Sequence, residues 1–202
     1  MQRARKLLPT PVDGQRIGIL GGSFDPAHSG HLHVAQTALR RMQLDYVWWI
    51  PARGNPLKST ETAFDERWAT VLEQISDHPR MATTDIERQL NLRYTVDLIH
   101  ILKSCAPRTR FVWLMGGDNL SGFHHWKGWD DIARTVPIAV VARPGAGPRA
   151  RLSKFAVRFR NDRLPNLQAA ALPMAKAPAW VHLRAPLNVE SSTRLRRLKH
   201  GR

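Results

Sequence analysis

The sequence predicts an α/β fold in a single domain, built as a doubly wound, mostly parallel sheet with helices on both faces. Short apolar runs typical of buried strands alternate along the chain with longer segments whose apolar residues recur at helical spacing. Two of the runs end in glycine pairs, at residues 21–22 and 116–117, as strands do where a tight turn leads into a helix. Ligands of such sheets bind beyond the carboxyl ends of the strands, so a site is expected at these turns.

The first predicted unit is a strand, a turn, a helix and a second strand. Residues 16–20 (RIGIL) have the apolar character of a buried strand. After Pro26, residues 31–42 place apolar side chains at helical spacing, with charged side chains on the outer face. Residues 46–51 (YVWWIP) are the next strand, which makes the whole segment a βαβ unit with parallel strands.

The rest of the chain repeats this order. Further strands are expected at residues 81–86, 110–115, 138–142 and 180–183. Further helices are expected at residues 64–78, 94–105 and 191–199. In the first of these helices one face should turn toward the core, and it carries Trp68, Val71, Leu72 and Ile75. Residues 144–178 show no clear periodicity, and the sequence predicts a long surface excursion there.

Length and composition favour one globular domain. The chain has 202 residues, of which 43% are hydrophobic and 23% charged, as in ordinary folded proteins. Residues 1–15 are basic and interrupted by prolines, so we expect a mobile leader, with the folded domain over residues 16–202. No apolar run approaches the roughly 18 residues that a membrane span needs. The single cysteine, Cys105, permits no internal disulfide and fits a core position in a cytoplasmic protein.

The positive charge is concentrated in the last third of the chain. The formal net charge is +15, yet residues 143–202 hold 14 of the 31 basic residues and only 2 of the 16 acidic ones. Such a block attracts anions, and composition alone favours a nucleic-acid partner. No aromatic-basic surface pattern or known nucleic-acid-reading motif accompanies the block. Nucleic-acid binding is therefore kept as an alternative, but we do not expect a nucleic acid to be the partner of this protein.

The densest group of polar residues follows the first predicted strand, in GGSFDPAHSGH at residues 21–31. Glycines let the backbone turn and approach a ligand closely, and the N–H groups at the start of the next helix attract an anion. His28 and His31 are three residues apart at that helix start, so both imidazoles can face one point where phosphate oxygens would bind. A metal site built with His33 as a third ligand is the alternative, although helical phase turns His33 away and no cysteine or carboxylate completes the set.

The motifs at the two ends of the chain resemble those of a known superfamily. The turn matches neither G-x-G-x-x-G nor G-x-x-x-x-G-K-[ST], so the standard nucleotide-binding motifs do not explain it. Residues 21–31, with HSGH at 28–31, instead resemble the HxGH signature of the nucleotidyltransferase superfamily, and SSTRLR at residues 191–196 resembles its second signature, SSTxxR. The resemblance implies a Rossmann-like nucleotidyltransferase domain over about residues 16–198.

Within that superfamily the chain resembles the bacterial nicotinate-nucleotide adenylyltransferases. The further matching segments are NPLK at residues 55–58, RYTVD at 93–97 and MGGDNL at 115–120 followed by Trp126. The resemblance implies transfer of the adenylyl group of ATP to nicotinate mononucleotide, with release of pyrophosphate and with Mg²⁺ accompanying the ATP. Two positions depart from the family pattern, because Gly117 stands where alanine is usual and Glu190 stands where an apolar residue usually precedes the serines.

The resemblance also implies roles for individual residues. The catalytic residues would be His28, His31 and Arg196, which donate hydrogen bonds to phosphate oxygens. ATP would be bound by Gly22, Ser23, Phe24, His28, His31, Gly116, Asp118, Ser192, Thr193 and Arg196. Nicotinate mononucleotide would be bound by Ser23, Lys58, Tyr94, Thr95, Asp118 and Trp126. The pyridine ring would stack on Trp126, the backbone at 94–95 would hold its carboxylate, and no resident metal site is implied.

Several of these residues have a purely structural alternative. The SST segment can serve as an ordinary helix N-cap, Asp118 as a cap of the helix after the second glycine pair, and Lys58 as a solvated lysine. A superfamily member that uses phosphopantetheine or nicotinamide mononucleotide is the alternative for the function. The resemblance at residues 94–95 and at Trp126 argues against it. A homo-oligomer is compatible with the sequence, and no membrane partner is expected.

Overall fold

The structure, a computed structural model, describes residues 2–9, 13–54, 62–143, 152–186, 190 and 192–200. Its strands form one seven-stranded sheet in the order β3-β2-β1-β4-β5-β7-β6, and every neighbouring pair is parallel. The strands are β1 (Arg16–Gly22), β2 (Tyr46–Pro51), β3 (Met81–Thr83), β4 (Arg110–Gly116), β5 (Ile138–Val141), β6 (Arg163–Leu164) and β7 (Trp180–Leu183). The order reverses between β1 and β4, as in a doubly wound sheet, so the predicted fold class is confirmed.

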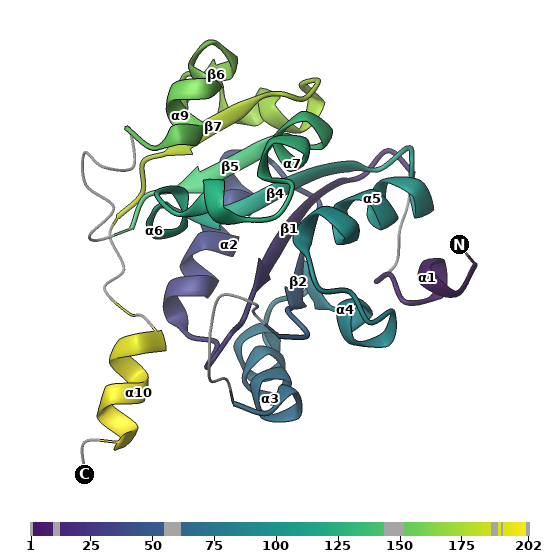
Figure 1. The fold of residues 1–202 in the computed structure, drawn as a ribbon, viewed down its shortest axis with the longest axis vertical. Helices are drawn as coiled ribbons and strands as arrows, with labels where there is room; N and C mark the ends of the chain where they lie inside the picture. The colour runs from purple at the N-terminus through teal and green to yellow at the C-terminus, as the bar shows by residue number, and fades with distance from the viewer. Residues whose placement is uncertain are drawn as a thin grey trace.

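Helices cover both faces of the sheet (Figure 1). One face is covered by α2 (Ser29–Arg41), α3 (Phe64–Ile75) and the 3₁₀ helix η3 (Asn166–Met174). The opposite face carries α1 (Gln2–Lys6), α4 (Ile86–Gln89), α5 (Thr95–Cys105), α7 (Trp129–Thr135) and α9 (Lys154–Arg158). The remaining elements are α6 (Gly117–Leu120), η1 (Phe123–His125), η2 (Arg160–Asp162) and the terminal helix α10 (Ser192–His200). None of the described helices combines the length and the apolar character that crossing a membrane requires.

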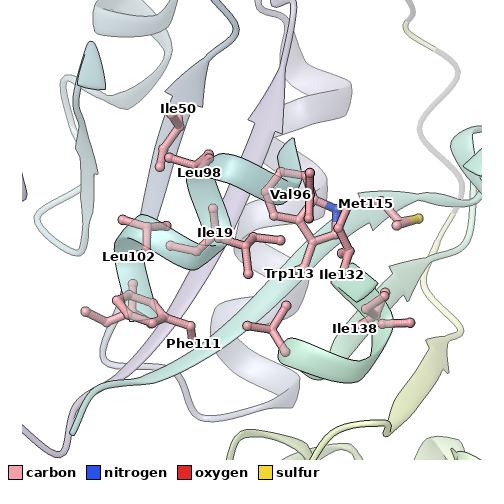
Figure 2. Packing of buried hydrophobic residues seen from close by; sticks show 14 of the residues in the cluster. Ile19, Ile50, Val96, Leu98, Leu102, Phe111, Trp113, Met115, Ile132 and Ile138 are labelled. Atoms are coloured by element: carbon pink, nitrogen blue, oxygen red, sulfur yellow. The ribbon is translucent and has the colours of Figure 1, made fainter. Parts of the chain in front are cut away.

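Alternate residues of the central strands pack into two apolar layers. In β4, Trp113 and Met115 face α5, whereas Val112 and Leu114 face α2. Figure 2 shows the first layer, in which Trp113 lies with Ile19 of β1 against residues of α5. Each large side chain buried in this way stabilises the fold by about 1.5–3 kcal/mol. Because these strands are buried on both faces, their sequences are continuous apolar runs rather than alternating ones.

Most predicted strands and helices match the structure to within a few residues. One strand differs in its length, and one helix differs in which of its side chains are buried. The strand expected at residues 81–86 ends at Thr83, and α4 begins at Ile86. In α3, Leu72 was predicted to face the core but is 46% exposed, while Arg67 is buried. The buried face carries Arg67, Val71 and Ile75, at i, i+4 and i+8, whereas Leu72 lies about 140° around the helix from Arg67. Arg67 is buried because its guanidinium binds backbone carbonyls of the loops at that end of the sheet.

The N-terminal segment differs from the mobile leader that the sequence predicted. Residues 2–9 include the short helix α1, and Ala4 and Leu8 are buried in the apolar layer that contains α5. The Thr84 hydroxyl donates a hydrogen bond to the carbonyl oxygen of Leu7 at 2.6 Å. Two apolar residues in a basic segment give no periodic signal, so the sequence could not show that they reach the core.

The segment after β5 also differs from its prediction as a surface excursion. Phe155 and Phe159 are buried, and the Trp180 indole of β7 donates to the carbonyl oxygen of Phe159 at 2.7 Å. β6 pairs with β7 and forms one edge of the sheet, while η3 buries Leu172 on the opposite face. The described part of this segment, residues 152–178, therefore belongs to the packed body. Its elements are too short to show a period in the sequence.

Candidate active site

A cavity of about 580 Å³ opens at the carboxyl ends of β1 and β4, where the strand order reverses. Every predicted binding residue that the structure describes lines it, namely Gly22, Ser23, Phe24, His28, His31, Tyr94, Thr95, Gly116, Asp118, Trp126, Ser192, Thr193 and Arg196. Lys58, with its neighbours at 55–57, lies outside the described residues. The structure thus brings together residues from five separate stretches of sequence at the position that the fold predicts.

His28 begins α2 and is held in one tautomer. Its backbone is extended, and its Nδ1 accepts a hydrogen bond from the backbone N–H of Gly30 at 3.0 Å, which makes it the N-cap. Burial, aided by the positive charge of Arg143 and opposed by Glu190 and Asp118, lowers the pKa of His28 from 6.5 to about 4. The ring is therefore neutral at pH 7, with its proton on Nε2, and can donate one hydrogen bond to a ligand.

His31 lies directly beside His28. Its backbone N–H donates to the carbonyl oxygen of His28 at 2.9 Å, and the two ring centroids are 3.9 Å apart. The buried ring of Phe24 packs edge-on against His31 at 4.9 Å and stacks on Trp49 at 5.3 Å. The two imidazoles therefore line one wall of the cavity, whereas His33 lies outside that lining.

Arg143 joins the helix start to the C-terminal segment, a role that sequence reasoning missed. Its Nη2 donates to the carbonyl oxygen of Glu190 at 2.5 Å, and its Nη1 lies 3.6 Å from a carboxylate oxygen of Asp118. The unusual carboxylate of Glu190 accepts a hydrogen bond from Ser29 at 2.8 Å. A Cβ on Gly30 would stand 2.8 Å from the Arg143 guanidinium and from the Glu190 carbonyl, so only glycine permits this packing.

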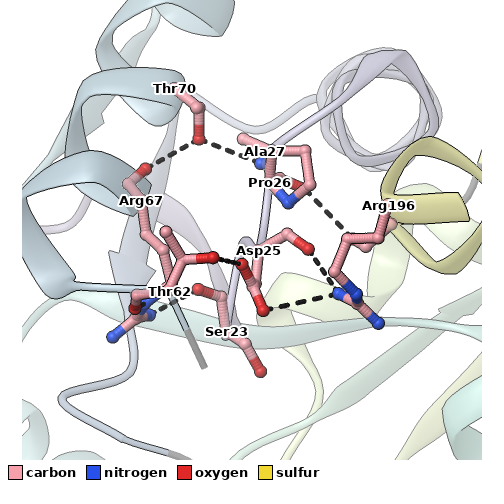
Figure 3. Close-up of polar contacts among 9 residues, drawn as sticks. Ser23, Asp25, Pro26, Ala27, Thr62, Arg67, Thr70 and Arg196 are labelled. Carbon is pink, nitrogen blue, oxygen red and sulfur yellow. Dashed lines mark hydrogen bonds and ion pairs between the residues drawn. The ribbon is translucent and has the colours of Figure 1, made fainter. Parts of the chain in front are cut away.

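The terminal helix α10 contacts the loop that follows β1 (Figure 3). Ser192 donates to the carbonyl oxygen of Pro26 at 3.0 Å. Arg196 donates to the carbonyl oxygen of Asp25 at 2.5 Å, and the same nitrogen lies 3.4 Å from the Asp25 carboxylate. The other oxygen of that buried carboxylate accepts a hydrogen bond from Thr62 at 2.5 Å. These contacts hold the two signature segments, 166 and more residues apart in sequence, against each other.

Arg67 supports the same loop from the opposite side. This buried guanidinium donates to the carbonyl oxygens of Ser23, Thr62 and Arg53, at 2.5, 3.0 and 3.3 Å. Figure 3 shows that Arg67 and Arg196 approach the loop from different helices. A buried charge of this kind is costly unless its hydrogen bonds are satisfied, and here backbone oxygens satisfy them. The sequence offered no signal for it, because its partners are backbone atoms.

The other end of the cavity is aromatic. Trp126 packs edge-on against Trp113 and Phe123, with ring centroids 6.2 and 5.4 Å apart. Tyr94 is the N-cap residue of α5, and its side chain makes no capping hydrogen bond to that helix. Both residues line the cavity together with Thr95. A flat aromatic ligand with polar substituents fits such surroundings.

Glu87 of α4 is a buried carboxylate at this cavity that sequence reasoning also missed. It is 6% exposed and accepts a hydrogen bond from the backbone N–H of Arg53 at 3.2 Å. Burial raises the pKa of Glu87 to about 7, against the opposing effects of that hydrogen bond and of the Arg67 charge. The folded protein therefore binds this proton more tightly than the unfolded chain does.

The raised pKa predicts how stability changes with pH. The contribution of Glu87 to the free energy of unfolding should fall as pH rises from 4.5 through about 7, by about 3 kcal/mol in total. Glu87→Gln should therefore raise the free energy of unfolding by up to that amount at pH 8 and little at pH 4.5. Urea unfolding at both pH values measures this, with Glu73→Gln on the exposed side of α3 as the matched control. An equal effect of Glu87→Gln at both pH values would contradict the expected titration.

The described residues include no group of three or more histidine, cysteine, aspartate or glutamate side chains placed to hold a metal ion. Around the starts of α2 and α10 the cavity is lined by the imidazoles of His28 and His31 and by the guanidinium groups of Arg143 and Arg196, alongside hydroxyl groups. Mg²⁺ prefers oxygen ligands and usually binds through substrate phosphates. The residues present therefore fit a metal that arrives on a nucleotide.

Comparison with known proteins gives the class of this protein. A family model described as cytidylyltransferase-like matches residues 19–198, so the chain belongs to that family of nucleotidyltransferases. It is 48% identical over 195 residues to a probable nicotinate-nucleotide adenylyltransferase of Parvibaculum lavamentivorans, covering 96% of each chain. It is 45% identical over 181 residues to one of Ruegeria sp. (strain TM1040), covering 90% of this chain and 96% of the relative. Within its family the chain is thus grouped with the nicotinate-nucleotide adenylyltransferases.

Solved structures agree on the fold. A Plasmodium falciparum nicotinic acid mononucleotide adenylyltransferase complexed with NaAD matches with a TM-score of 0.70 over 91% of this chain and 83% of that chain. A putative nicotinate-nucleotide adenylyltransferase from Vibrio parahaemolyticus matches with a TM-score of 0.54 over 73% of this chain and 79% of that chain. The sequence identities are 18% and 19%, so these matches bear on the fold alone.

Proposed function

We propose that this protein transfers the adenylyl group of ATP to nicotinate mononucleotide and so makes nicotinate adenine dinucleotide and pyrophosphate. The observation that carries the proposal is one continuous cavity lined at one end by His28, His31 and Arg196 and at the other by Tyr94, Thr95 and Trp126. A nucleotide triphosphate and an aromatic mononucleotide can therefore meet within a single site. The relatives named for this activity support the assignment.

The reaction is a direct displacement at phosphorus. A phosphate oxygen of the mononucleotide attacks the α-phosphorus of ATP, and the bond from that phosphorus to the oxygen bridging to the β-phosphate breaks. Pyrophosphate leaves with the electron pair. Both reactants are anions, so the protein must hold them in line and neutralise the charge that develops on the leaving group. Mg²⁺ accompanying ATP would be held by the nucleotide phosphates and would neutralise part of their charge.

The chain's own groups supply the remaining stabilisation. The Nε2–H of neutral His28, the imidazole of His31 and the backbone of Gly22, Ser23 and Phe24 donate to the α- and β-phosphate oxygens. Arg196, Ser192 and Thr193 hold the β- and γ-phosphates at the start of α10. Gly116, at the end of β4, and Asp118, just after it, bind the ribose, and the Asp118 carboxylate accepts hydrogen bonds from its hydroxyl groups. Lys58 is proposed to reach the phosphates, from a segment outside the described residues.

The acceptor is bound at the aromatic end. Its pyridine ring stacks on Trp126, and the backbone N–H groups at residues 94–95 bind the ring carboxylate. Ser23 and Asp118 also line the cavity, and we propose that they contact both nucleotides.

Pyrophosphate release tests the function directly. The purified protein is supplied with ATP and Mg²⁺ and, in turn, with nicotinate mononucleotide, nicotinamide mononucleotide or phosphopantetheine. Release with nicotinate mononucleotide at a rate well above the other two is the expected result. Release with only one of the others would keep the reaction type and overturn the acceptor. A folded protein silent with all three would overturn the proposed function.

A further inference from the structure

Two positively charged side chains flank Tyr94 at the aromatic end of the cavity. The Lys127 ammonium lies 4.2 Å from the centroid of the Tyr94 ring, and the Arg93 guanidinium carbon lies 5.7 Å from it. Arg93, Tyr94 and Lys127 all line the cavity, as does Trp126, the residue before Lys127. Two segments far apart in the sequence thus bring two cations to the wall beside the ring-binding surface.

The position of Lys127 is set by close packing of its loop on α5. Gly128 follows it with φ of +65°, a backbone conformation that side chains other than glycine rarely adopt. A Cβ at that position would lie 3.0 Å from Val96, in the first turn of α5. The loop therefore lies directly against the start of α5, and the cation–π contact with Tyr94 holds the ammonium there.

These cations keep their charge available to a ligand. Among the residues that the structure describes, neither Lys127 nor Arg93 is in an ion pair with a carboxylate. The acidic side chains of the described cavity lining are Asp118, which faces Arg143, and Glu87, which accepts a hydrogen bond from the backbone of Arg53. An anionic substituent on a bound ring would therefore meet uncompensated positive charge at this wall.

We propose that Lys127, with Arg93, is a specificity-determining cation that favours an acceptor ring bearing a carboxylate over the same ring bearing a neutral amide. This role rests on the proposed function, because it assumes that the acceptor ring lies on Trp126. Two backbone N–H groups already favour a carboxylate, which offers two acceptor oxygens, over an amide, which offers one acceptor and one donor group. A nearby cation adds a second, electrostatic source of preference. A full positive charge distinguishes the two substituents, because it attracts the carboxylate and has little effect on the amide.

The test compares binding of nicotinate mononucleotide and nicotinamide mononucleotide by calorimetry, so it does not depend on turnover. Lys127→Gln should weaken binding of the first about tenfold and change binding of the second by less than threefold. Arg93→Gln should act in the same direction. Lys127→Arg keeps the positive charge, so it should retain most of the preference for nicotinate mononucleotide. Lys103→Gln, in the last turn of α5 and outside the cavity lining, removes the same charge and should leave both affinities unchanged.

Salt provides a second readout. Raising the salt concentration from 50 to 300 mM should reduce the preference of the wild-type protein and have a smaller effect on Lys127→Gln, because screening weakens the same interaction that the substitution removes. Equal loss of affinity for both mononucleotides in Lys127→Gln would overturn the proposal, since it would place the lysine at their shared phosphate or in the fold. An unchanged preference would overturn it too. Either result is compatible with adenylyl transfer by the wild-type protein, which pyrophosphate release measures separately.

Discussion

Replacing His31 with alanine is expected to lower the turnover number for adenylyl transfer by roughly 100-fold or more. The side chain lines the cavity beside His28 and stands at the start of α2, where phosphate oxygens would bind. Losing one donor that acts in the transition state removes stabilisation that water cannot replace in an enclosed site. Steady-state pyrophosphate release at saturating ATP and acceptor measures the change.

The matched control is His33→Ala, two positions along the same helix and outside the cavity lining. Both variants remove an imidazole from α2, so a general effect on the helix would lower both activities. Thermal unfolding checks that each variant is folded. Turnover of folded His31→Ala within threefold of the wild-type value would contradict the proposed role, as would equal losses in the two variants.

The parts of this molecule that could be predicted from sequence are those in which neighbouring residues carry the signal. Buried parallel strands are continuous apolar runs, and β2 was predicted with both of its ends correct. The turn after β1 combines glycines with His28 and His31 within a few residues, so one local motif predicted a site there, and these residues line the cavity. Resemblance then extended that interpretation to Tyr94, Trp126 and Arg196, which the structure places on the same cavity.

The parts that could not be predicted depend on contacts between distant residues. Arg143 and Glu190 are 47 positions apart, and Arg67 is buried by backbone carbonyls that have no sequence signature. In the sequence Glu87 is one acidic residue of a short helix, and nothing near it in the chain shows that the folded protein buries it. Short helices such as α7 and α9 contain too few turns to establish a period. Tertiary packing, rather than local propensity, determines all of these features.

Arg196→Gln is expected to lower kcat/KM for ATP by about 100- to 1,000-fold. One terminal nitrogen of the guanidinium is engaged by the carbonyl and carboxylate oxygens of Asp25, and the side chain lines the cavity. A planar guanidinium has five N–H donors, so the remaining ones can bind phosphate oxygens while Asp25 fixes the orientation. Arg196→Lys keeps the charge but lacks this fork, so it should recover only part of the loss.

Two comparisons separate binding of phosphate from a purely structural role of Arg196. Arg194→Gln removes the same charge from α10 at a position outside the described cavity lining, and it should change kcat/KM by less than threefold. Asp25→Asn should weaken the contact between α10 and the loop after β1, although the Arg196 side chain is still present in that variant. If Arg196 served only to hold α10, then Arg196→Gln and Asp25→Asn would lower kcat/KM equally and would lower the melting temperature in proportion. We expect instead that Arg196→Gln has much the larger effect on kcat/KM, because only that variant removes the proposed donor to the leaving pyrophosphate.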